Sequence, residues 1–192
     1  MVAIAQFLVP FLFGIFNVQV NWTNANHTGI AVSAEGQNDF ISQCIEGGLK
    51  VRYRFDMRLC RSRTMWFPDC GPTRTETRSM QYDPISQQYN VTVDTYHDNE
   101  APHSVVVGTA KDALAIAESV RRLPLAQLPS AGARFEKKGA YVAVRAVAEC
   151  KGESSGIFER IPLILSFGLI DSSVSDSGWV NFDLESGKII SP

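Results

Sequence analysis

Apolar and basic residues alternate along residues 49–63, which read LKVRYRFDMRLCRSR. One set of alternate positions is apolar: Leu49, Val51, Tyr53, Phe55, Met57 and Leu59. The other set is mostly basic: Lys50, Arg52, Arg54, Asp56, Arg58 and Cys60. Strand side chains point to opposite faces with a period of two, whereas an amphipathic helix repeats apolar residues three and four apart. The segment is therefore predicted to be a long strand with one buried face.

The residues before this strand predict a shorter strand and a short helix. Residues 27–36 favour a strand with Ile30 and Val32 on one face. Residues 37–48 favour a helix, because Asn38 or Gln37 can cap it and two glycines, Gly47 and Gly48, supply a left-handed stop. The side chains expected to point inward from this helix are Phe40, Ile41, Cys44 and Ile45.

Turn residues after the long strand predict hairpins. Asp83, Pro84, Ile85 and Ser86 have turn chemistry and separate strands that end at Tyr82 and resume at Gln88. A further hairpin tip is expected around Trp66, Phe67 and Pro68. Two consecutive hairpins form an antiparallel meander.

A second, longer helix is predicted over residues 109–123. Thr109 is its expected cap, Asp112 offers the reciprocal capping bond, and apolar residues recur at helical spacing at Ala113, Ile116, Ala117 and Val120. Residues 104–108, 139–150 and 178–189 favour strands, with the buried face of 139–150 left open. The predicted fold class is α+β: an antiparallel sheet, meander or sandwich-like, with two helices, the longer packed on the sheet.

The N-terminal 18 residues carry no charged side chain, and the first acidic and basic residues are Glu35 and Lys50. A signal-peptide core has about 7–15 apolar residues and a membrane-spanning helix about 20. Residues 1–20 are therefore expected to be an export signal, followed by one β-rich domain over residues 21–192. The nearest candidate cleavage site ends at Ala25, and a retained membrane anchor or a buried first element are the alternatives.

Basic charge is concentrated between Lys50 and Arg78, where eight basic side chains face three acidic ones, although the whole chain has a net charge of −2. Such a strand attracts phosphate, acidic glycans or acidic protein surfaces. A nucleic-acid module would normally be basic as a whole and would carry aromatic residues on its charged face. Tyr53 and Phe55 alternate away from the arginines, so nucleic acid is not expected. A merely solvated sheet face is the alternative to a binding surface.

Four cysteines are spaced too widely for a zinc ribbon. In an oxidising compartment they would form two disulfides. The local pair, Cys60 and Cys70, would close the expected hairpin tip, and Cys44 and Cys150 would then pair by elimination. Reduced, buried thiols are the alternative.

Other chemistry has weak support. His97, Asp98, Glu100 and His103 are metal-ligand types, but their spacing matches no defined zinc or calcium loop, so no metal is expected. The common serine-hydrolase, dinucleotide and nucleotide-triphosphatase motifs do not occur, and no cofactor is expected.

The order of several motifs resembles a known family. These motifs are CIEGG running into the long strand, the Trp66 tip, YDPISQQYNV, a helix and SGWVNFDL. Together they resemble the proteobacterial family called domain of unknown function 4390, over about residues 28–185. The resemblance implies an exported or envelope location and no assigned activity. The matching positions look structural: Glu46, Gly47, Gly48, Trp66, Tyr82, Asp83, Pro84, Tyr89, Trp179 and Phe182.

The sequence favours an exported, non-catalytic protein of the periplasm or the membrane-associated cell envelope. We expect it to bind an envelope protein or a membrane-surface partner through its basic strand and tip, with the residues Arg52, Arg54, Arg58, Arg61, Arg63, Trp66 and Phe67. The alternative is a small-ligand carrier or enzyme with a pocket between the sheet and helix 109–123, lined by Tyr82, Tyr89, Tyr96 and His97.

Overall fold

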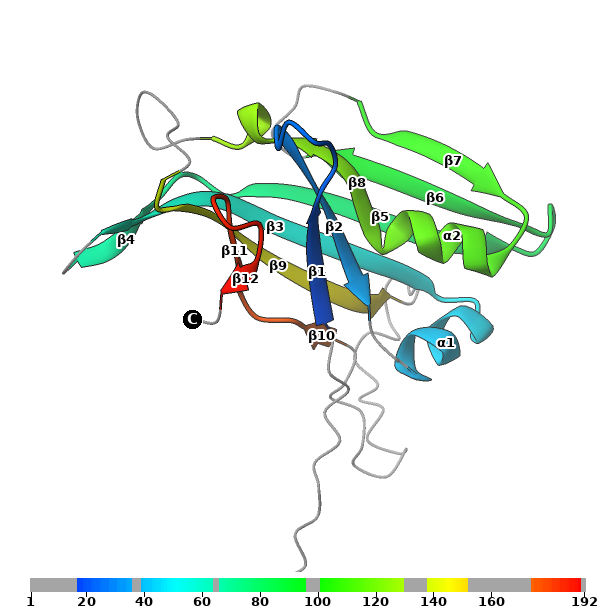
Figure 1. The fold of residues 1–192 in the computed structure, drawn as a ribbon. Helices are drawn as coiled ribbons and strands as arrows, with labels where there is room; N and C mark the ends of the chain where they lie inside the picture. Colours follow the sequence, from blue (N-terminus) through cyan, green and yellow to red (C-terminus); the bar gives the residue numbers. More distant parts are fainter. Residues whose placement is uncertain are drawn as a thin grey trace, which may run out of the picture.

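The computed structural model describes residues 17–35, 39–63, 66–95, 101–129, 138–151 and 174–190. Their strands form two antiparallel sheets (Figure 1). The larger sheet has nine strands: in order β12 (Ile189–Ile190), β11 (Val180–Asp183), β9 (Ala140–Lys151), β3 (Lys50–Arg63), β5 (Arg74–Asp83), β6 (Gln88–Thr95) and β7 (His103–Val107), with β4 (Trp66–Cys70) on β3 and β10 (Val174–Asp176) on β9. The smaller sheet has the order β1 (Asn17–Trp22), β2 (Gly29–Glu35) and β8 (Ser119–Pro124).

Two helices, α1 (Asp39–Glu46) and α2 (Ala110–Ala117), and a short 3-10 turn (Leu125–Gln127) complete the described part of the chain. The predicted α+β class, an antiparallel sheet with two helices, is confirmed. Among the described residues, no helix is both long enough and apolar enough to span a membrane.

Strand β3 lies at the centre of the larger sheet, between β9 and β5, as its alternating sequence requires. Its apolar positions are buried from Val51 to Leu59, and its basic positions between them are partly exposed. The buried positions form an inner face, and the positions of Arg52, Arg54 and Arg58 belong to an outer face. Residues that pair across neighbouring strands share a face. The residues of β5 and β9 that pair with inner positions of β3 therefore also belong to the inner face.

The meander is confirmed, because β3, β5, β6 and β7 follow one another with antiparallel pairing. Asp83 closes the β5–β6 turn by accepting hydrogen bonds from the Ile85 N–H (2.9 Å) and the Ser86 hydroxyl (2.8 Å). These donors lower the pKa of Asp83, the Ser86 hydroxyl most. The carboxylate is therefore an ionised part of the turn rather than a poised acid.

The core lies between the two sheets. In Figure 1, β1 and β2 cross the long strands β3 and β9 at a steep angle. Val18 and Ile30 of the smaller sheet belong to one buried cluster with Tyr53 and Phe55 of β3. The facing positions of β9, Ala146 and Ala148, are small and fully buried. Small side chains there let the two layers approach closely, as in other crossed sheet packings.

The second helix is shorter than predicted. It begins after its cap as expected, since the Thr109 hydroxyl accepts from the Asp112 N–H (3.1 Å) and donates to the Asp112 carboxylate (2.7 Å). It ends at Ala117, and residues 119–124 form strand β8 instead of the expected helical turns up to 123. Pairing with β2 satisfies backbone groups that a longer helix would have left open on that strand.

Strand β1 contributes to the core from the first described residues. Val18 is 1% exposed, and the boundary expected between residues 20 and 21 falls inside this strand. At its end, the Trp22 ring stacks on His27 (4.6 Å) and meets Phe182 edge-on (5.3 Å). These contacts join the smaller sheet to the β11–β12 hairpin. Residues 1–16, which contain most of the apolar N-terminal segment, lie outside the described residues.

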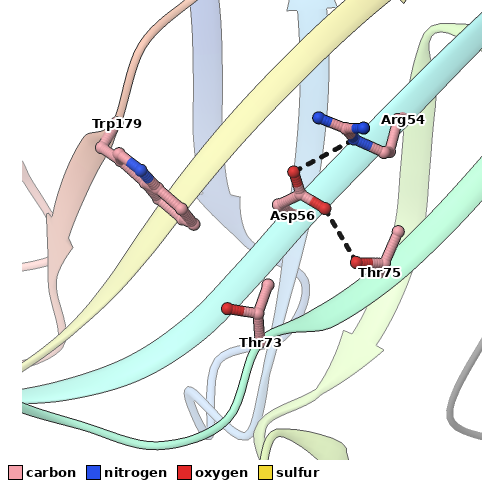
Figure 2. Close-up of a pocket in the computed structure, with 5 residues that line it drawn as sticks. All are labelled: Arg54, Asp56, Thr73, Thr75 and Trp179. Atoms are coloured by element: carbon pink, nitrogen blue, oxygen red, sulfur yellow. Dashed lines mark hydrogen bonds and ion pairs between the residues drawn. The ribbon is translucent and has the colours of Figure 1, made fainter.

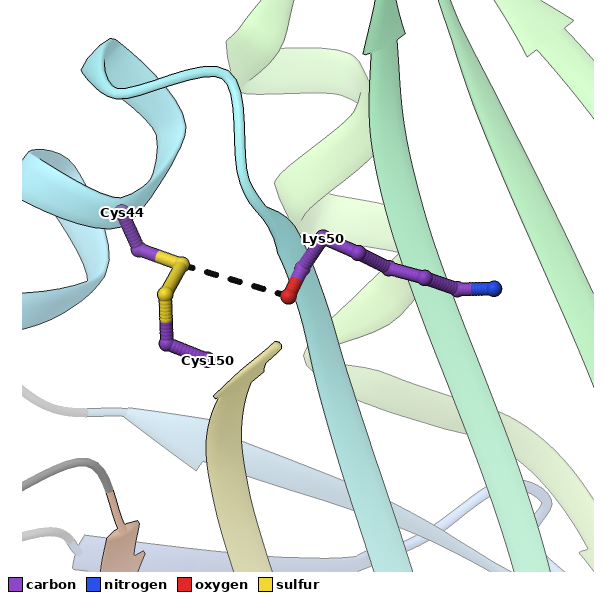
Figure 3. Close-up of a disulfide and its surroundings, with 3 residues drawn as sticks. All are labelled: Cys44, Lys50 and Cys150. Atoms are coloured by element: carbon purple, nitrogen blue, oxygen red, sulfur yellow. Dashed lines mark hydrogen bonds between the residues drawn. A yellow bond between two sulfur atoms is a disulfide. The ribbon is translucent and has the colours of Figure 1, made fainter. Parts of the chain in front are cut away.

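The disulfide between Cys44 and Cys150 ties α1 to the end of β9, and its Cα atoms are 6.1 Å apart (Figure 3). The Cys44 sulfur also lies 4.0 Å from the carbonyl oxygen of Lys50, at the start of β3. Gly48 adopts the left-handed conformation that was predicted to stop α1. The helix is thereby held at the point where the chain enters the central strand.

Glu118, the C-cap of α2, is half-buried beside Tyr53. Its burial predicts that the stability of the fold depends on pH. Burial raises the pKa of Glu118, Glu35 raises it further, and the hydrogen bond from the Tyr53 hydroxyl (3.0 Å) opposes them. The folded protein therefore holds this proton more tightly than the unfolded chain. Stability conferred by this group is complete below the unfolded pKa and is lost as the pH rises through the folded pKa.

Glu118→Gln is therefore expected to raise the free energy of unfolding at pH 7 by up to about 1 kcal/mol, discounted for the solvent access of this carboxyl. The amide keeps an oxygen that accepts from Tyr53. Urea unfolding between pH 4 and pH 7 checks this. Glu35→Gln is the control: it removes the repulsion, keeps an oxygen that can accept from the Gln19 amide, and gives a smaller gain. A loss of stability in Glu118→Gln at pH 7 contradicts the assignment.

Candidate functional site

The hairpin formed by β3 and β4 carries the tip residues that the sequence singled out. Cys60 and Cys70 are paired in register and joined by a disulfide whose Cα atoms are 4.0 Å apart, which confirms that prediction. Beyond this bond, Arg61 and Arg63 are exposed, and Phe67 is 92% exposed. Arg63 pairs with Asp69 across the hairpin at 2.5 Å. The side chain of Trp66 lies outside the described residues, although its backbone pairs with Arg63.

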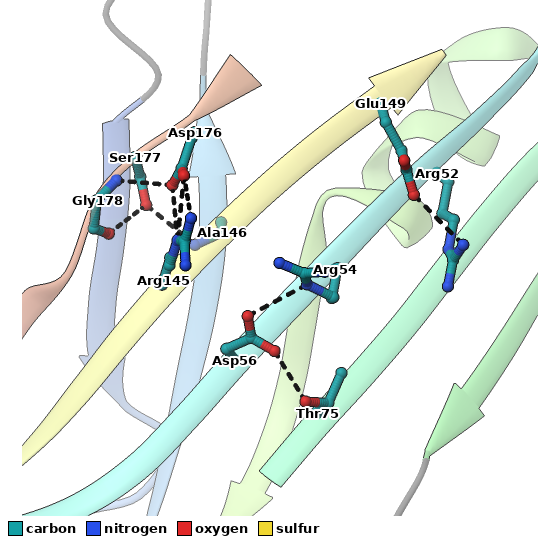
Figure 4. Close-up of polar contacts among 10 residues, drawn as sticks. All are labelled: Arg52, Arg54, Asp56, Thr75, Arg145, Ala146, Glu149, Asp176, Ser177 and Gly178. Atoms are coloured by element: carbon teal, nitrogen blue, oxygen red, sulfur yellow. Dashed lines mark hydrogen bonds and ion pairs between the residues drawn. The ribbon is translucent and has the colours of Figure 1, made fainter. Parts of the chain in front are cut away.

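Two other predicted binding arginines, Arg52 and Arg54, lie along the outer face of the sheet (Figure 4), several residues before the tip on β3. Arg52 pairs with Glu149 of β9 at 3.3 Å, and Arg54 pairs with Asp56 of β3 at 3.2 Å. Acidic side chains therefore offset much of the basic charge in this row. The structure brings together Arg61, Arg63 and Phe67 at the tip, but it places Arg52 and Arg54 in a mixed ion-pair network.

Two further arginines of the basic segment belong to the inner face. Arg74 is buried, and Arg78 packs against α2. The positive charge counted between residues 50 and 78 is therefore divided between the two faces of the sheet. Arg74 and Arg78 of β5 therefore do not add to a basic outer face.

The outer face is hollowed beside β3. A shallow, open cavity of about 450 Å³ is lined by Arg54, Asp56, Thr73, Thr75 and Trp179 (Figure 2). Asp56 accepts hydrogen bonds from Arg54 Nε (3.2 Å) and from the Thr75 hydroxyl (2.8 Å). The carboxylate is thereby oriented by groups on two strands, and Trp179 lies across from it in Figure 2.

Trp179 is positioned by the segment between β10 and β11. Arg145 of β9 holds this segment through a bidentate ion pair with Asp176, and the Ser177 hydroxyl accepts from the Ala146 N–H at 3.0 Å. The guanidinium of Arg58 lies 4.1 Å from the centre of the Trp179 ring. Arg58 is thus a partner of an aromatic ring, a role that the alternation alone did not predict.

The space proposed for a carrier or enzyme pocket holds core side chains. Ala113 and Ala117 of α2 are fully buried in the same cluster as Met80 and Val91 of the sheet. Tyr82 and Tyr89 pack on each other at 5.0 Å rather than around a cavity. Among the residues that the structure describes, this packing leaves no support for a pocket beneath α2.

The residues expected to line the pocket and the candidate metal ligands lie only partly within the described residues. Residues 96–100, which include Tyr96, His97, Asp98 and Glu100, lie outside the described residues. Among the residues that are described, no group of three or more His, Cys, Asp or Glu side chains is arranged to hold a metal ion.

Comparison with known proteins gives one match. A family model described as "Domain of unknown function (DUF4390)" matches residues 23–153. The match begins in the β1–β2 connection and ends shortly after β9, so it covers the tip and the Cys44–Cys150 pair but not Trp179 or Phe182. No curated protein and no solved structure matches the chain.

Proposed function

This chain belongs to the DUF4390 family, and we propose that it is an exported, non-catalytic protein that binds a protein partner through the β3–β4 tip. The observation that carries the proposal is Phe67, a large aromatic side chain that is 92% exposed at the end of a disulfide-closed hairpin. Exposed aromatic residues beside arginine are typical of the centres of protein interfaces. Arg61 and Arg63 flank it on the paired strand.

The two described strands of the tip are tied to each other before any partner binds. The Cys60–Cys70 disulfide and the Arg63–Asp69 ion pair both cross the hairpin. Strands that are already cross-linked lose less conformational entropy when they meet a partner, which favours affinity. Among the described side chains of the tip, Phe67 is the one exposed aromatic and offers little area for insertion into a bilayer, so a protein partner is favoured over a membrane surface.

An oxidising, non-cytoplasmic compartment is indicated by the two disulfides. We place the protein in the periplasm or at the cell envelope, with the apolar N-terminal segment as the export signal or anchor. Cleavage after Ala25 would remove β1, whose Val18 and Val20 are buried in the core. The proposal therefore puts any cleavage before Asn17, so that the mature domain keeps β1.

The proposal predicts that Phe67→Ala and Arg63→Glu each lose a partner that the wild type retains. Proteins co-purified from a detergent-free extract of the oxidising compartment are quantified by mass spectrometry for each variant. The matched control is Ile85→Ala, because Ile85 is 94% exposed on the β5–β6 turn, away from the tip. Truncating a central aromatic of an interface costs about 2 kcal/mol or more, a loss of roughly thirtyfold in affinity.

A partner that is depleted in both tip variants and kept by Ile85→Ala supports the proposal. Identical partner lists for wild type, Phe67→Ala and Arg63→Glu contradict it. Binding of the tip to phospholipid vesicles, lost in Phe67→Ala, would also contradict it and would assign the tip to a membrane surface.

A further inference from the structure

We propose that the outer-face cavity beside Trp179 binds a pyranose residue of a neutral glycan. This site is separate from the tip and goes beyond the proposed protein partner. Its lining joins an indole ring, a carboxylate, a guanidinium and two hydroxyl groups around about 450 Å³ of open space. A sugar presents hydroxyl groups at its rim and an apolar C–H surface on its ring face, and this lining is complementary to both.

The polar side of the cavity is arranged to hydrogen-bond hydroxyl groups. Each carboxylate oxygen of Asp56 accepts one bond within the protein, one from Arg54 and one from Thr75, and has further lone pairs for a ligand. Arg54 uses Nε for this contact, and its side chain is 42% exposed. Its terminal N–H groups therefore face solvent as donors beside an acceptor that is already fixed in orientation.

The apolar side is the indole of Trp179. Arg58 lies over the ring at 4.1 Å, and the ring also packs on the small cluster of Cys60, Tyr141 and Ala143. These contacts hold the ring in place before a ligand arrives. Stacking a sugar face on the ring surface that borders the cavity would bury apolar area without adding a charge.

The arginines beside this cavity are already engaged. Asp56, a lining residue with little exposure, pairs with Arg54. Arg145 pairs with Asp176, and Arg58 lies over the Trp179 ring. An anionic ligand would have to approach a fixed carboxylate. Hydrolysis of a glycan uses two carboxyl groups flanking the scissile bond. The described lining contains one, so we infer binding rather than cleavage.

The test is a titration of the full-length exported protein with four neutral trisaccharides: maltotriose, cellotriose, mannotriose and N-acetylglucosamine trimer. Glucose 6-phosphate and inorganic phosphate are the anionic probes. In ¹H–¹⁵N spectra, saturable shifts of the Trp179 indole N–H, assigned with Trp179→Phe, are expected with at least one neutral sugar. The Trp22 indole, packed between His27 and Phe182, is the internal reference and should not move. A shallow site for one sugar ring predicts a Kd near the millimolar range.

Trp179→Ala and Arg54→Gln should each weaken this binding at least tenfold. Phe67→Ala, which removes the tip aromatic, should leave it unchanged. This separates the site from the protein-partner proposal, because each can fail while the other holds. No saturable shift with any neutral sugar up to 50 mM, unchanged affinity of both cavity variants when it is read from the backbone amide shifts of the cavity residues, or a preference for phosphate would overturn the inference.

Discussion

Replacing Cys44 and Cys150 together by serine is expected to lower the free energy of unfolding by about 4 kcal/mol. The bond closes a loop with a sequence separation of 106, so it restricts the unfolded chain far more than a short loop does. It also fixes α1 against the end of β9 and the start of β3. Urea unfolding of the oxidised wild type and of the double variant measures the difference.

The second disulfide supplies the matched control for this prediction. Cys60 and Cys70 have a sequence separation of 10, and on loop entropy their double serine variant should lose about 3 kcal/mol or less. The order of the two losses is the informative result. A larger loss for Cys60→Ser, Cys70→Ser would show that the tip, and not the α1 junction, holds the domain together.

Arg78→Met is expected to cost about 3–5 kcal/mol, because it leaves the carboxylate of Glu76 buried without its partner. The two side chains are only 12% and 7% exposed, with Arg78 Nη2 and Glu76 Oε1 2.5 Å apart. Arg78 also donates to the Ile116 carbonyl at 2.8 Å, which joins β5 to the last turn of α2. The change therefore removes both an ion pair and a link between the layers.

Two controls separate this buried pair from the surface pairs. Arg52→Met breaks the partly exposed pair with Glu149 and should cost no more than about 1 kcal/mol. The double variant Glu76→Gln, Arg78→Met should be more stable than Arg78→Met alone, since no charge is left uncompensated. If Arg78→Met and Arg52→Met lower the free energy of unfolding by equal amounts in urea, the buried pair stabilises the fold no more than the surface pair does.

Strands in which apolar and polar residues alternate clearly could be predicted from the sequence. Strand β3, the Asp83 turn and the β9 segment all depend on local patterns. The Cys60–Cys70 pair follows from where β3 ends, and the Cys44–Cys150 pair was then left by elimination. Strand β8 was missed because Val120 fits the helical spacing of Ala113 and Ala117 as well as it fits a strand. Only the pairing of β8 with β2, residues far apart in the chain, decides between the two.

The candidate site was harder to predict for the same reason. Phe67 and Arg63 are neighbours on one hairpin, so local sequence was enough to bring them together. The cavity joins Asp56 of β3 to Trp179 more than a hundred residues later, and nothing local links them. The counterions were missed as well, because Glu149 reaches Arg52 only through the register of β9 on β3. The positive charge on one face of a strand can be neutralised by acidic side chains of the neighbouring strand.

In-cell photocrosslinking at the tip tests the central claim most directly. A photoreactive phenylalanine analogue is placed at position 67 in one strain and at position 85 in another, both sites being more than 90% exposed. The account predicts a discrete covalent adduct with another protein from position 67 that position 85 does not give. It also predicts that the adduct weakens at least tenfold when Cys60 and Cys70 are both replaced by serine. Equal adducts from the two positions, or none from position 67, would contradict the assignment of the tip as a binding surface.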